Sequence, residues 1–355
     1  MNKSDFCELL NAAGPSGYET NALSVWISMA GQFADECYID EFGNGVAIIK
    51  AETPNLLSGD VINKHTVILD SHIDEIGLQV NHIDDEGIIH VGAIGSYDPA
   101  ILVGQRVKIY SRKSDEFICY GVIGRLPTHL QSEDNEKTKI KIENIFIDIG
   151  SSTFDITSNL ISIGDYVTID REMEELSLFN IFTGKAIDNR AGCFAILETL
   201  ERHAKLSNRK TTLIGIASVR EETYSTSGAR FYDSWKADDI ITIDVTHASD
   251  QPNFEVNEQG ERLMGSGPSI AVGSFLSKSL ISELEYTAEH NNIDYTIEAC
   301  PAGTGTNAEH TLLGNSNACR VGVISIPIKY MHTPVEMVNF DDIVNTAILL
   351  SKLYE

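Results

Sequence analysis

The chain has 355 residues, with 52 Asp and Glu against 26 Lys and Arg, so that its net charge is -26 at pH 7. This charge argues against partners such as nucleic acids and anionic membrane surfaces, both of which reward basic side chains. The length exceeds what most single hydrophobic cores organise and therefore predicts two domains.

The ends and the cysteines of the chain bear on its compartment. The N-terminal stretch has no apolar core of the length that a signal peptide needs, and no segment approaches a membrane span. The scattered cysteines favour reduced thiols and a cytoplasmic address; they are Cys7, Cys37, Cys119, Cys193, Cys300 and Cys319. Because none has a zinc-knuckle spacing, a metal site would have to use His and carboxylate ligands.

The first part of the chain alternates helices and strands. Helical spacing of apolar residues predicts helices over 5–13 and 19–33, separated by the turn residues of 14–17. Short β-branched runs predict a hairpin from 37–39 and 46–49, and a buried strand over 66–70.

The pattern changes after Gly77. Short strands are expected at 78–83, 88–91, 106–109 and 117–122, and the β character continues to about residue 178. No helical period is evident here, and the polar stretch 131–139 is expected to be an exposed loop. Closely spaced short strands with turn residues between them predict a small barrel or sandwich.

Alternating helices and strands resume after Gly184. Strands are expected at 211–219, 239–245, 296–299 and 320–327, and helices at 188–205, 227–235, 277–291, 307–313 and 340–355. The sequence thus predicts an α/β domain, with a mixed sheet flanked by helices, formed by 1–77 and 179–355. Residues 78–178 form an inserted β-rich domain.

One stretch carries much of the chemical signal. Residues 67–77 read VILDSHIDEIG, an apolar strand that ends in metal-competent groups. His72 and Asp74 are two residues apart, so that on an extended chain they point to the same side. A carboxylate there could orient an imidazole that ligates a metal. Further metal-competent residues stand at strand ends or at a helix start: Asp188, Glu221, Glu222, Asp244 and His332.

Each of these residues also has a simpler explanation. Asp188 could cap its helix, and the adjacent Glu221 and Glu222 could belong to a solvated loop. Asp244 could cap the loop that follows it, and His332 could be a surface histidine. Taken together, carboxylate and imidazole ligands without thiolates suit a hydrolytic site with two metals. Adjacent glutamates at a strand end point in different directions, so that one could bind metal while the other acts as a base.

The chain resembles the dinuclear metallo-aminopeptidases of the glutamyl aminopeptidase and tetrahedral aminopeptidase (TET) type, some of which are labelled endoglucanase or cellulase. The resemblance extends nearly end to end. It covers residues 14–19 (GPSGYE), 72–77, 121–129, 148–150, 184–192, 220–222, 244–248, 265–268 and 326–327, with Tyr330 and His332.

The resemblance implies a ligand set for two divalent metal ions, with zinc or cobalt as the expected elements. His72 and Asp244 would bind one ion, and Glu222 and His332 the other. Asp188 would bridge the two.

The resemblance also implies roles outside the ligand set. Glu221 would be the general base that accepts a proton from water, and Asp74 would orient His72. The fold would be of the zinc-exopeptidase type. The β-rich insertion would serve oligomerisation, from dimers to a tetrahedral dodecamer.

Two stretches depart from the family pattern. The glutamate pair is followed by 223–229, TYSTSGA, which is one residue longer than the usual Val-Gly-Leu-Arg-Gly-Ala. The usual Gly-Thr-Asp-Ala reads Gly-Thr-Asn-Ala at 305–308. Both departures are expected on the substrate side and bear on specificity.

The predicted activity is therefore the release of N-terminal residues from peptides. A related metal-dependent amidohydrolase, such as a deacylase or carboxypeptidase, could use the same ligands. A glycoside hydrolase is disfavoured because its two carboxylates must flank a sugar, whereas those of this chain are assigned to metal. A non-catalytic peptide-binding assembly protein is the remaining alternative.

Overall fold

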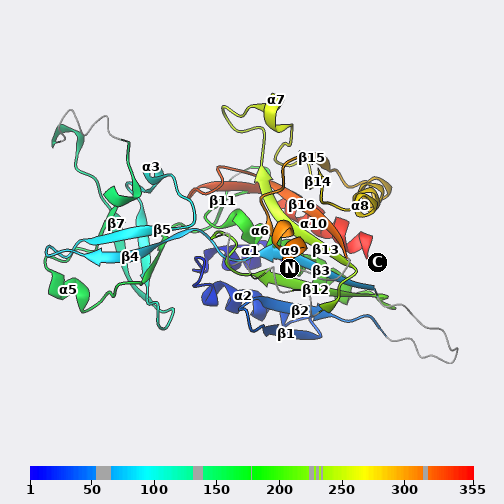
Figure 1. Cartoon of the computed structure of the whole chain (residues 1–355), viewed down its shortest axis with the longest axis horizontal. Helices are drawn as coiled ribbons and strands as arrows, with labels where there is room; N and C mark the ends of the chain where they lie inside the picture. Colours follow the sequence, from blue (N-terminus) through cyan, green and yellow to red (C-terminus); the bar gives the residue numbers. More distant parts are fainter. Residues whose placement is uncertain are drawn as a thin grey trace.

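The computed structural model describes residues 1–52, 65–130, 139–176, 178–223, 228, 232, 235–314 and 319–355. These residues form a large mixed sheet with helices, and a separate closed barrel (Figure 1). This architecture confirms the predicted α/β class with an inserted β-barrel. The loop predicted at 131–139, the helix predicted at 227–235 and the family departure at 223–229 lie mostly outside the described residues.

Within the described ranges the sheet has 11 strands, and its main path runs β1-β2-β12-β3-β13-β16-β17-β11-β10. The four central strands, β12, β3, β13 and β16, are parallel, so that their carboxyl ends meet at one edge. The strands are β1 (Glu36–Ile39), β2 (Gly45–Ile49), β3 (His65–His72), β10 (Glu174–Glu175), β11 (Ile181–Gly184), β12 (Thr211–Ser218), β13 (Asp239–His247), β14 (Ser269–Gly273), β15 (Thr296–Cys300), β16 (Arg320–Lys329) and β17 (Glu336–Asn339).

Strand β3 shows why these segments form the centre of the sheet. Val67 and Leu69 pack into the larger hydrophobic core, whereas Ile68 packs into a second core on the other face. A strand that is covered on both faces reads as a continuous apolar run, which is how 67–69 reads.

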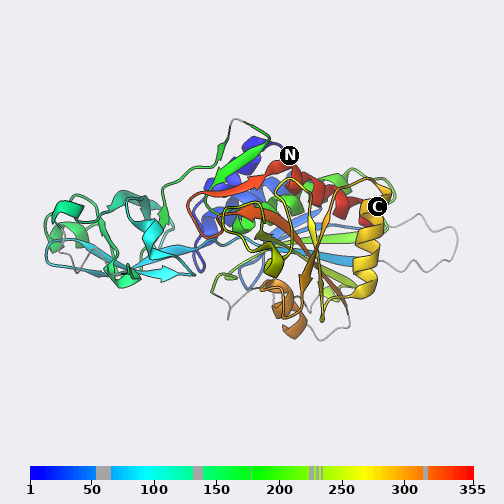
Figure 2. The ribbon, with the colours of Figure 1, turned by 90° about the horizontal axis from the view of Figure 1, so that it is seen from above.

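Helices cover both faces of the sheet, and Figure 2 shows α10 on one side of it and α9 on the other. Asn2 and Asp5 form a capping box at the start of α1, which stabilises that helix end. No helix in the described part of the chain has the length and apolar character that crossing a membrane requires. The helices outside the barrel are α1 (Lys3–Asn11), α2 (Thr20–Ala30), α6 (Ile187–Ala204), α7 (Val256–Gln259), α8 (Lys278–His290), α9 (Asn307–Gly314) and α10 (Phe340–Leu353).

The barrel closes in the order β4-β5-β8-β7-β6-β9 and has its own apolar core. Its strands are β4 (Gly77–Ile83), β5 (Ile89–Ile94), β6 (Arg106–Tyr110), β7 (Phe117–Ile123), β8 (Phe146–Asp148) and β9 (Tyr166–Ile169). Short helical segments interrupt what the sequence predicts to be purely β: α3 (Pro99–Leu102), α5 (Phe154–Ser158), η1 (Thr128–Leu130) and η2 (Ile142–Asn144). Helices this short carry too few turns to show a period.

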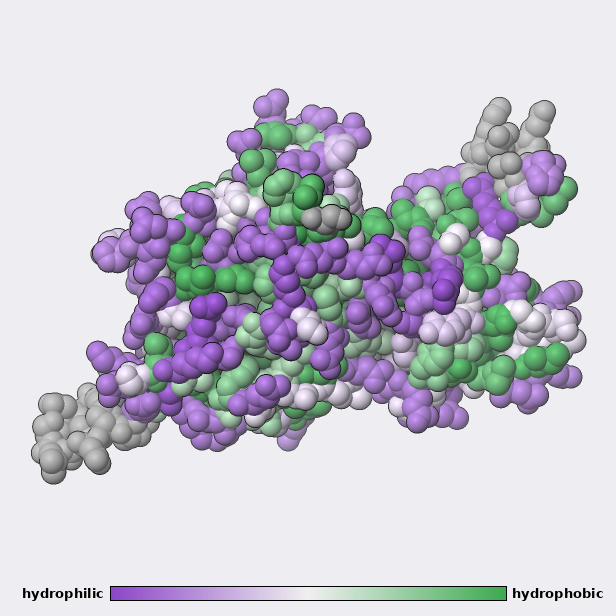
Figure 3. Space-filling model, turned by 180° about the vertical axis from the view of Figure 1, so that it is seen from behind, coloured by the Kyte–Doolittle hydropathy of each residue, from purple (hydrophilic) through white to green (hydrophobic). Residues whose placement is uncertain are grey.

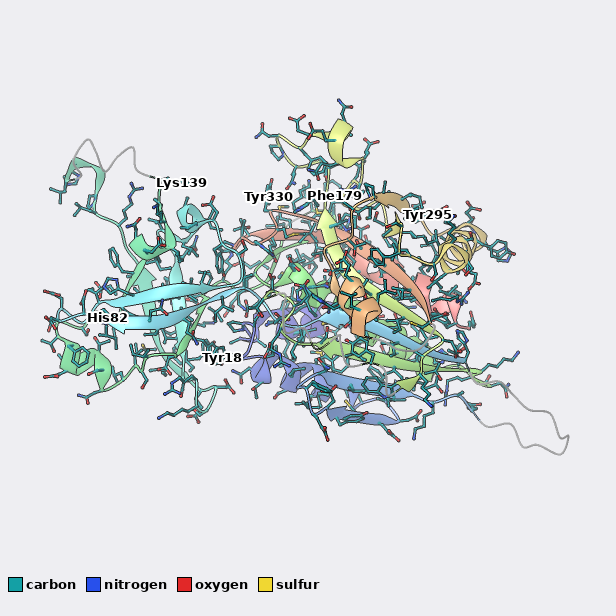
Figure 4. All side chains as sticks on the ribbon, viewed as in Figure 1. Tyr18, His82, Lys139, Phe179, Tyr295 and Tyr330 are labelled. Carbon is teal, nitrogen blue, oxygen red and sulfur yellow. The ribbon has the colours of Figure 1, made fainter. Side chains whose placement is uncertain are left out.

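Tyr18 lies where the barrel meets the sheet domain (Figure 4). Its ring stacks on that of Tyr166 with 4.5 Å between centroids. Its hydroxyl accepts a hydrogen bond from Gln79 Nε2 (2.5 Å) and donates one to the Gly164 carbonyl (3.1 Å). These contacts fix the barrel to the segment that precedes α2.

Candidate metal centre

The candidate residues converge at the carboxyl edge of the four parallel strands. His72 ends β3, Asp244 lies near the end of β13, and His332 follows β16. Glu221 and Glu222 follow β12, and Asp188 lies in the first turn of α6. Because parallel strands end at one edge, residues far apart in the sequence meet there.

Asp188 joins the two histidines. Its Oδ1 lies 3.1 Å from His72 Nε2, and its Oδ2 lies 3.2 Å from His332 Nε2. Asp244 Oδ1 is 3.8 Å from His72 Nε2, and Glu222 Oε1 is 3.4 Å from His332 Nε2. The structure thus brings together all five residues that the sequence suggests as ligands.

Two groups of these residues could each hold a metal ion. The first is His72, Asp188 and Asp244, and the second is Asp188, Glu222 and His332. Within each group the ligand atoms lie within 4.8 Å of one another. Imidazole and carboxylate donors suit zinc and similar divalent ions. Glu222 Oε1 is buried and makes no hydrogen bond to any described residue, as expected of an atom placed to bind a cation.

The simpler explanations fail for three of the acidic residues. Glu221 and Glu222 are each only 7% exposed, so that they do not form a solvated loop. Asp188 is not the N-cap of α6, because Ala186 holds that position, and the backbone of Asp188 is not helical.

The protonation behaviour of the acids follows from crowding and burial. Burial, reinforced by neighbouring acids, raises the pKa of Glu221 to about 9 and that of Asp244 to about 8. Burial alone would also raise the pKa of Asp188, but its hydrogen bonds with His332 and His72 outweigh burial and lower it.

Burial alone would lower the pKa of His332, but Asp188 and Glu222 raise it to about 11. The pKa of His72 is likewise raised despite burial, chiefly by contact with Asp188 and Asp74. So many carboxylates in a buried space require positive charge, which can come from protons or from metal ions.

Asp74 is fully buried, and its side chain binds the backbone of Glu221 and Glu222. Its two carboxylate oxygens accept hydrogen bonds from the backbone N–H groups of Glu221 and Glu222, each at 3.1 Å. The Ser16 hydroxyl donates a further hydrogen bond to it. His72 Nδ1 lies 3.2 Å from the Asp74 carbonyl and 3.6 Å from its carboxylate. Asp74 therefore contacts both His72 and the loop after β12.

Two residues that the sequence does not single out support the ligands. Asn189 Nδ2 donates a hydrogen bond to Asp244 Oδ1 at 2.8 Å. Glu336 Oε2 accepts from the Asp188 N–H at 3.2 Å, and its Oε1 accepts from the His332 N–H at 2.9 Å. Asn189 lies within the 184–192 motif, which could have pointed to it. Glu336 has no comparable sequence signal.

A buried charge cluster lies behind the site. Glu75 Oε1 lies 2.8 Å from Lys185 Nζ and 3.3 Å from Arg190 Nη2, and it also accepts a hydrogen bond from the Gly14 N–H. Arg190 donates to the Ile73 carbonyl as well. The cluster ties together the residues just before the barrel and the residues where the chain returns from it.

A cavity of about 240 Å³ opens over the candidate ligands. Its lining beyond them is Glu221, Val245, Thr246, His247, Glu298, Thr304, Gly305, Thr306 and Met331. The backbone N–H groups of Thr304 and Gly305 donate to Glu309 Oε1 at 2.6 and 3.2 Å. Asn307 Nδ2 donates to Ser218 Oγ at 2.8 Å and ties the loop to the end of β12. The 304–306 wall is thus held in place by hydrogen bonds.

Comparison with known proteins gives consistent matches over nearly the whole chain. The M42 glutamyl aminopeptidase family matches residues 57–349. A lysyl aminopeptidase from Pyrococcus furiosus is 30% identical, with 98% of this chain and 95% of that protein covered.

Solved structures also match. An aminopeptidase from the archaeon Desulfurococcus kamchatkensis has a TM-score of 0.86 at 30% identity, with 99% of this chain and 94% of that chain covered. The TET1 peptidase of Pyrococcus horikoshii, described as assembling into a tetrahedron or a large octahedral shell, has a TM-score of 0.83 at 25% identity. There 99% of this chain and 98% of that chain are covered.

Proposed function

Because the chain belongs to the M42 glutamyl aminopeptidase family and is therefore a hydrolase that acts on peptides, we propose that it is a dinuclear metal-dependent aminopeptidase. The observation that carries the proposal is the pair of ligand groups that share Asp188 beneath the cavity. The reaction is release of the N-terminal residue of a peptide.

Five residues would hold two divalent metal ions in this proposal. His72 and Asp244 would hold one, Glu222 and His332 would hold the other, and Asp188 would be shared by the two. Bound there, divalent ions supply an acidified water and polarise the scissile carbonyl. Zinc fits these donors, and cobalt fits them as well.

Glu221 is the proposed general base. It is buried at the cavity, belongs to neither ligand group, and its Oε2 lies 3.9 Å from His72 Nε2. Its carboxylate accepts a proton from the attacking water and returns it to the leaving amine. Asp74 is the proposed positioning residue, since it contacts His72 and the Glu221 backbone. These contacts fix the positions of Glu221 and His72 relative to each other.

The barrel is the proposed assembly domain. We propose that the chain divides into 1–77 with 179–355, and 78–178. The two separate cores support an inserted domain, and Met173 and β10 near its end already pack with the sheet domain. Large apolar side chains are exposed on the barrel, including Phe117, Tyr120 and Val122, and Figure 3 shows hydrophobic areas on its surface. Contiguous exposed apolar surface is typical of an interface. By analogy with the TET1 peptidase, we propose a homo-oligomer, from a dimer up to a tetrahedral dodecamer.

Replacing the base tests the proposal. Glu221→Gln should retain two metal ions per chain, measured by mass spectrometry of the elements, yet hydrolyse aminoacyl 4-nitroanilides at least about 100-fold more slowly. Glu8→Gln, an exposed position on α1, is the matched control and should keep full activity. An unchanged rate in Glu221→Gln would refute the assignment. Hydrolysis of N-acetylated substrates in preference to free-amine substrates would refute aminopeptidase action.

A further inference from the structure

One carboxylate of the cavity lining belongs to neither the metal groups nor the proposed base. Glu298 lies on β15, whose side chains alternate so that Glu298 faces inward between two exposed neighbours. Its Oε1 accepts a hydrogen bond from the Thr246 hydroxyl at 2.8 Å. Arg262 Nε lies 3.7 Å from the same oxygen. No described residue hydrogen-bonds to the other oxygen, Oε2, which leaves that oxygen available for a ligand.

The charge that this wall presents to the cavity is negative. The Glu298 side chain is 16% exposed and lines the cavity, whereas that of Arg262 is 4% exposed and does not line it. Arg262 is further held by donating to the Gln259 carbonyl at 2.7 Å. Arg262 therefore contacts Glu298 outside the cavity lining, while the Glu298 carboxylate faces the cavity.

Strand β13 connects this wall to the metal groups. Asp244 and Thr246 are two residues apart on that strand, so that their side chains point to the same side. Thr246 in turn donates to Glu298, and all three residues line the cavity. A substrate whose α-amine and scissile bond sit at the metals therefore reaches Glu298 with a side chain that extends along this wall.

We propose that this part of the cavity is a subsite for the side chain of the N-terminal residue, and that it selects a long basic side chain, Lys or Arg. The inference rests on the proposed aminopeptidase function and adds its substrate class. Val245 and Met331, which also line the cavity, contact the methylene stem, and Glu298 Oε2 accepts a hydrogen bond from the terminal cation. Long basic side chains bury their stems and pair their charged ends in this manner.

The test compares side chains of similar length and different charge. The metal-loaded enzyme should show a kcat/KM for lysyl 4-nitroanilide at least about 10-fold above that for the norleucyl compound, because an added charge-assisted hydrogen bond distinguishes the two. Glu298→Gln, which keeps the shape and removes the charge, should lower the lysyl value by about 10- to 100-fold. The norleucyl value should change less than about twofold, and Glu8→Gln should change neither.

Binding of the free amino acids separates this inference from the function on which it rests. Calorimetry should show L-lysine binding more tightly than L-norleucine, with the difference lost in Glu298→Gln, even if no substrate is hydrolysed. Failure to hydrolyse any substrate would overturn the proposed function, whereas this binding pattern would still support the basic subsite. Equal binding of the two amino acids, preference for a glutamyl substrate, or an equal loss on both substrates in Glu298→Gln would overturn the subsite.

Discussion

The buried cluster of Glu75, Lys185 and Arg190 allows a sharp prediction about stability. It contains two cations and one carboxylate, and the three side chains are 9% exposed or less. Removing the anion should therefore be more damaging than removing one cation. The two perturbations are Glu75→Gln and Lys185→Met, both close in size to the native side chains.

The expected change in the free energy of unfolding depends on which charged side chains remain buried after each substitution. Glu75→Gln leaves two buried cations without a counter-charge, which should lower the free energy of unfolding by about 3–5 kcal/mol. Burial and the nearby Arg190 lower the pKa of Lys185 from 10.5 to about 8, although Glu75 opposes them. The folded environment thus disfavours charged Lys185 by about 3 kcal/mol. Lys185→Met removes this cost and keeps the Glu75–Arg190 pair, so that it should destabilise by less than about 1 kcal/mol.

The pH dependence provides a second test of the same reasoning. Between pH 8 and 10.5 the unfolded chain still holds the Lys185 proton that the folded protein has released. Since the unfolded state then binds more protons, the free energy of unfolding rises with pH across this window. The wild-type protein should therefore gain stability relative to Lys185→Met as the pH rises from 8 to 10.5.

Urea unfolding followed by circular dichroism, at pH 7 and at pH 9.5, measures both effects. The reasoning would be refuted if Glu75→Gln cost no more than Lys185→Met, or if the wild type lost stability relative to Lys185→Met on going to the higher pH.

Two further predictions concern Asp70 and the metal ions. Tyr232→Phe removes the hydroxyl that donates to fully buried Asp70 at 2.7 Å, so that thermal or urea unfolding should show a loss of about 1–3 kcal/mol; a loss below about 0.5 kcal/mol would contradict it. In the metal-free protein the pKa values of Glu221 and Asp244 are about 9 and about 8, so that zinc binding at pH 7 should release protons and tighten as the pH rises towards 9. Calorimetry in buffers of different ionisation enthalpy measures the release, and identical heats in all buffers would rule it out.

Sequence patterns predict the parts of the site that depend on strand ends. His72 follows the apolar run of β3, and Asp244 lies near the end of the apolar run of β13. Because these strands are parallel, the residues at their carboxyl ends meet at one edge of the sheet. An apolar run that ends in polar residues therefore already indicates where such a site can form. The barrel is similarly evident from closely spaced short strands.

Other parts of the site depend on backbone geometry that residue types do not encode. Ala186 and Arg220 adopt left-handed backbone conformations, with φ of 58° and 63°, although neither is a residue type that favours them. Glu336 supports the site by accepting hydrogen bonds from the backbone N–H groups of Asp188 and His332. Every residue except proline carries such a group, so that residue types in the sequence do not indicate these contacts. Strand β17, which ends just before α10, has only four residues, too few to show alternation clearly.

The placement of Asp188 has a consequence for how the protein folds. His72 and Asp188 are 116 residues apart in the sequence, and the barrel lies between them. Closing so long a loop costs chain entropy that only the completed contacts repay. The contact between the bridging ligand of the proposed centre and His72 therefore adds to the sequence separation that folding must overcome. The last of the proposed ligands, His332, lies near the end of the chain. A partly synthesised chain that ends before it lacks a ligand of the second group, so that we expect hydrolytic activity only once nearly the whole chain has been made.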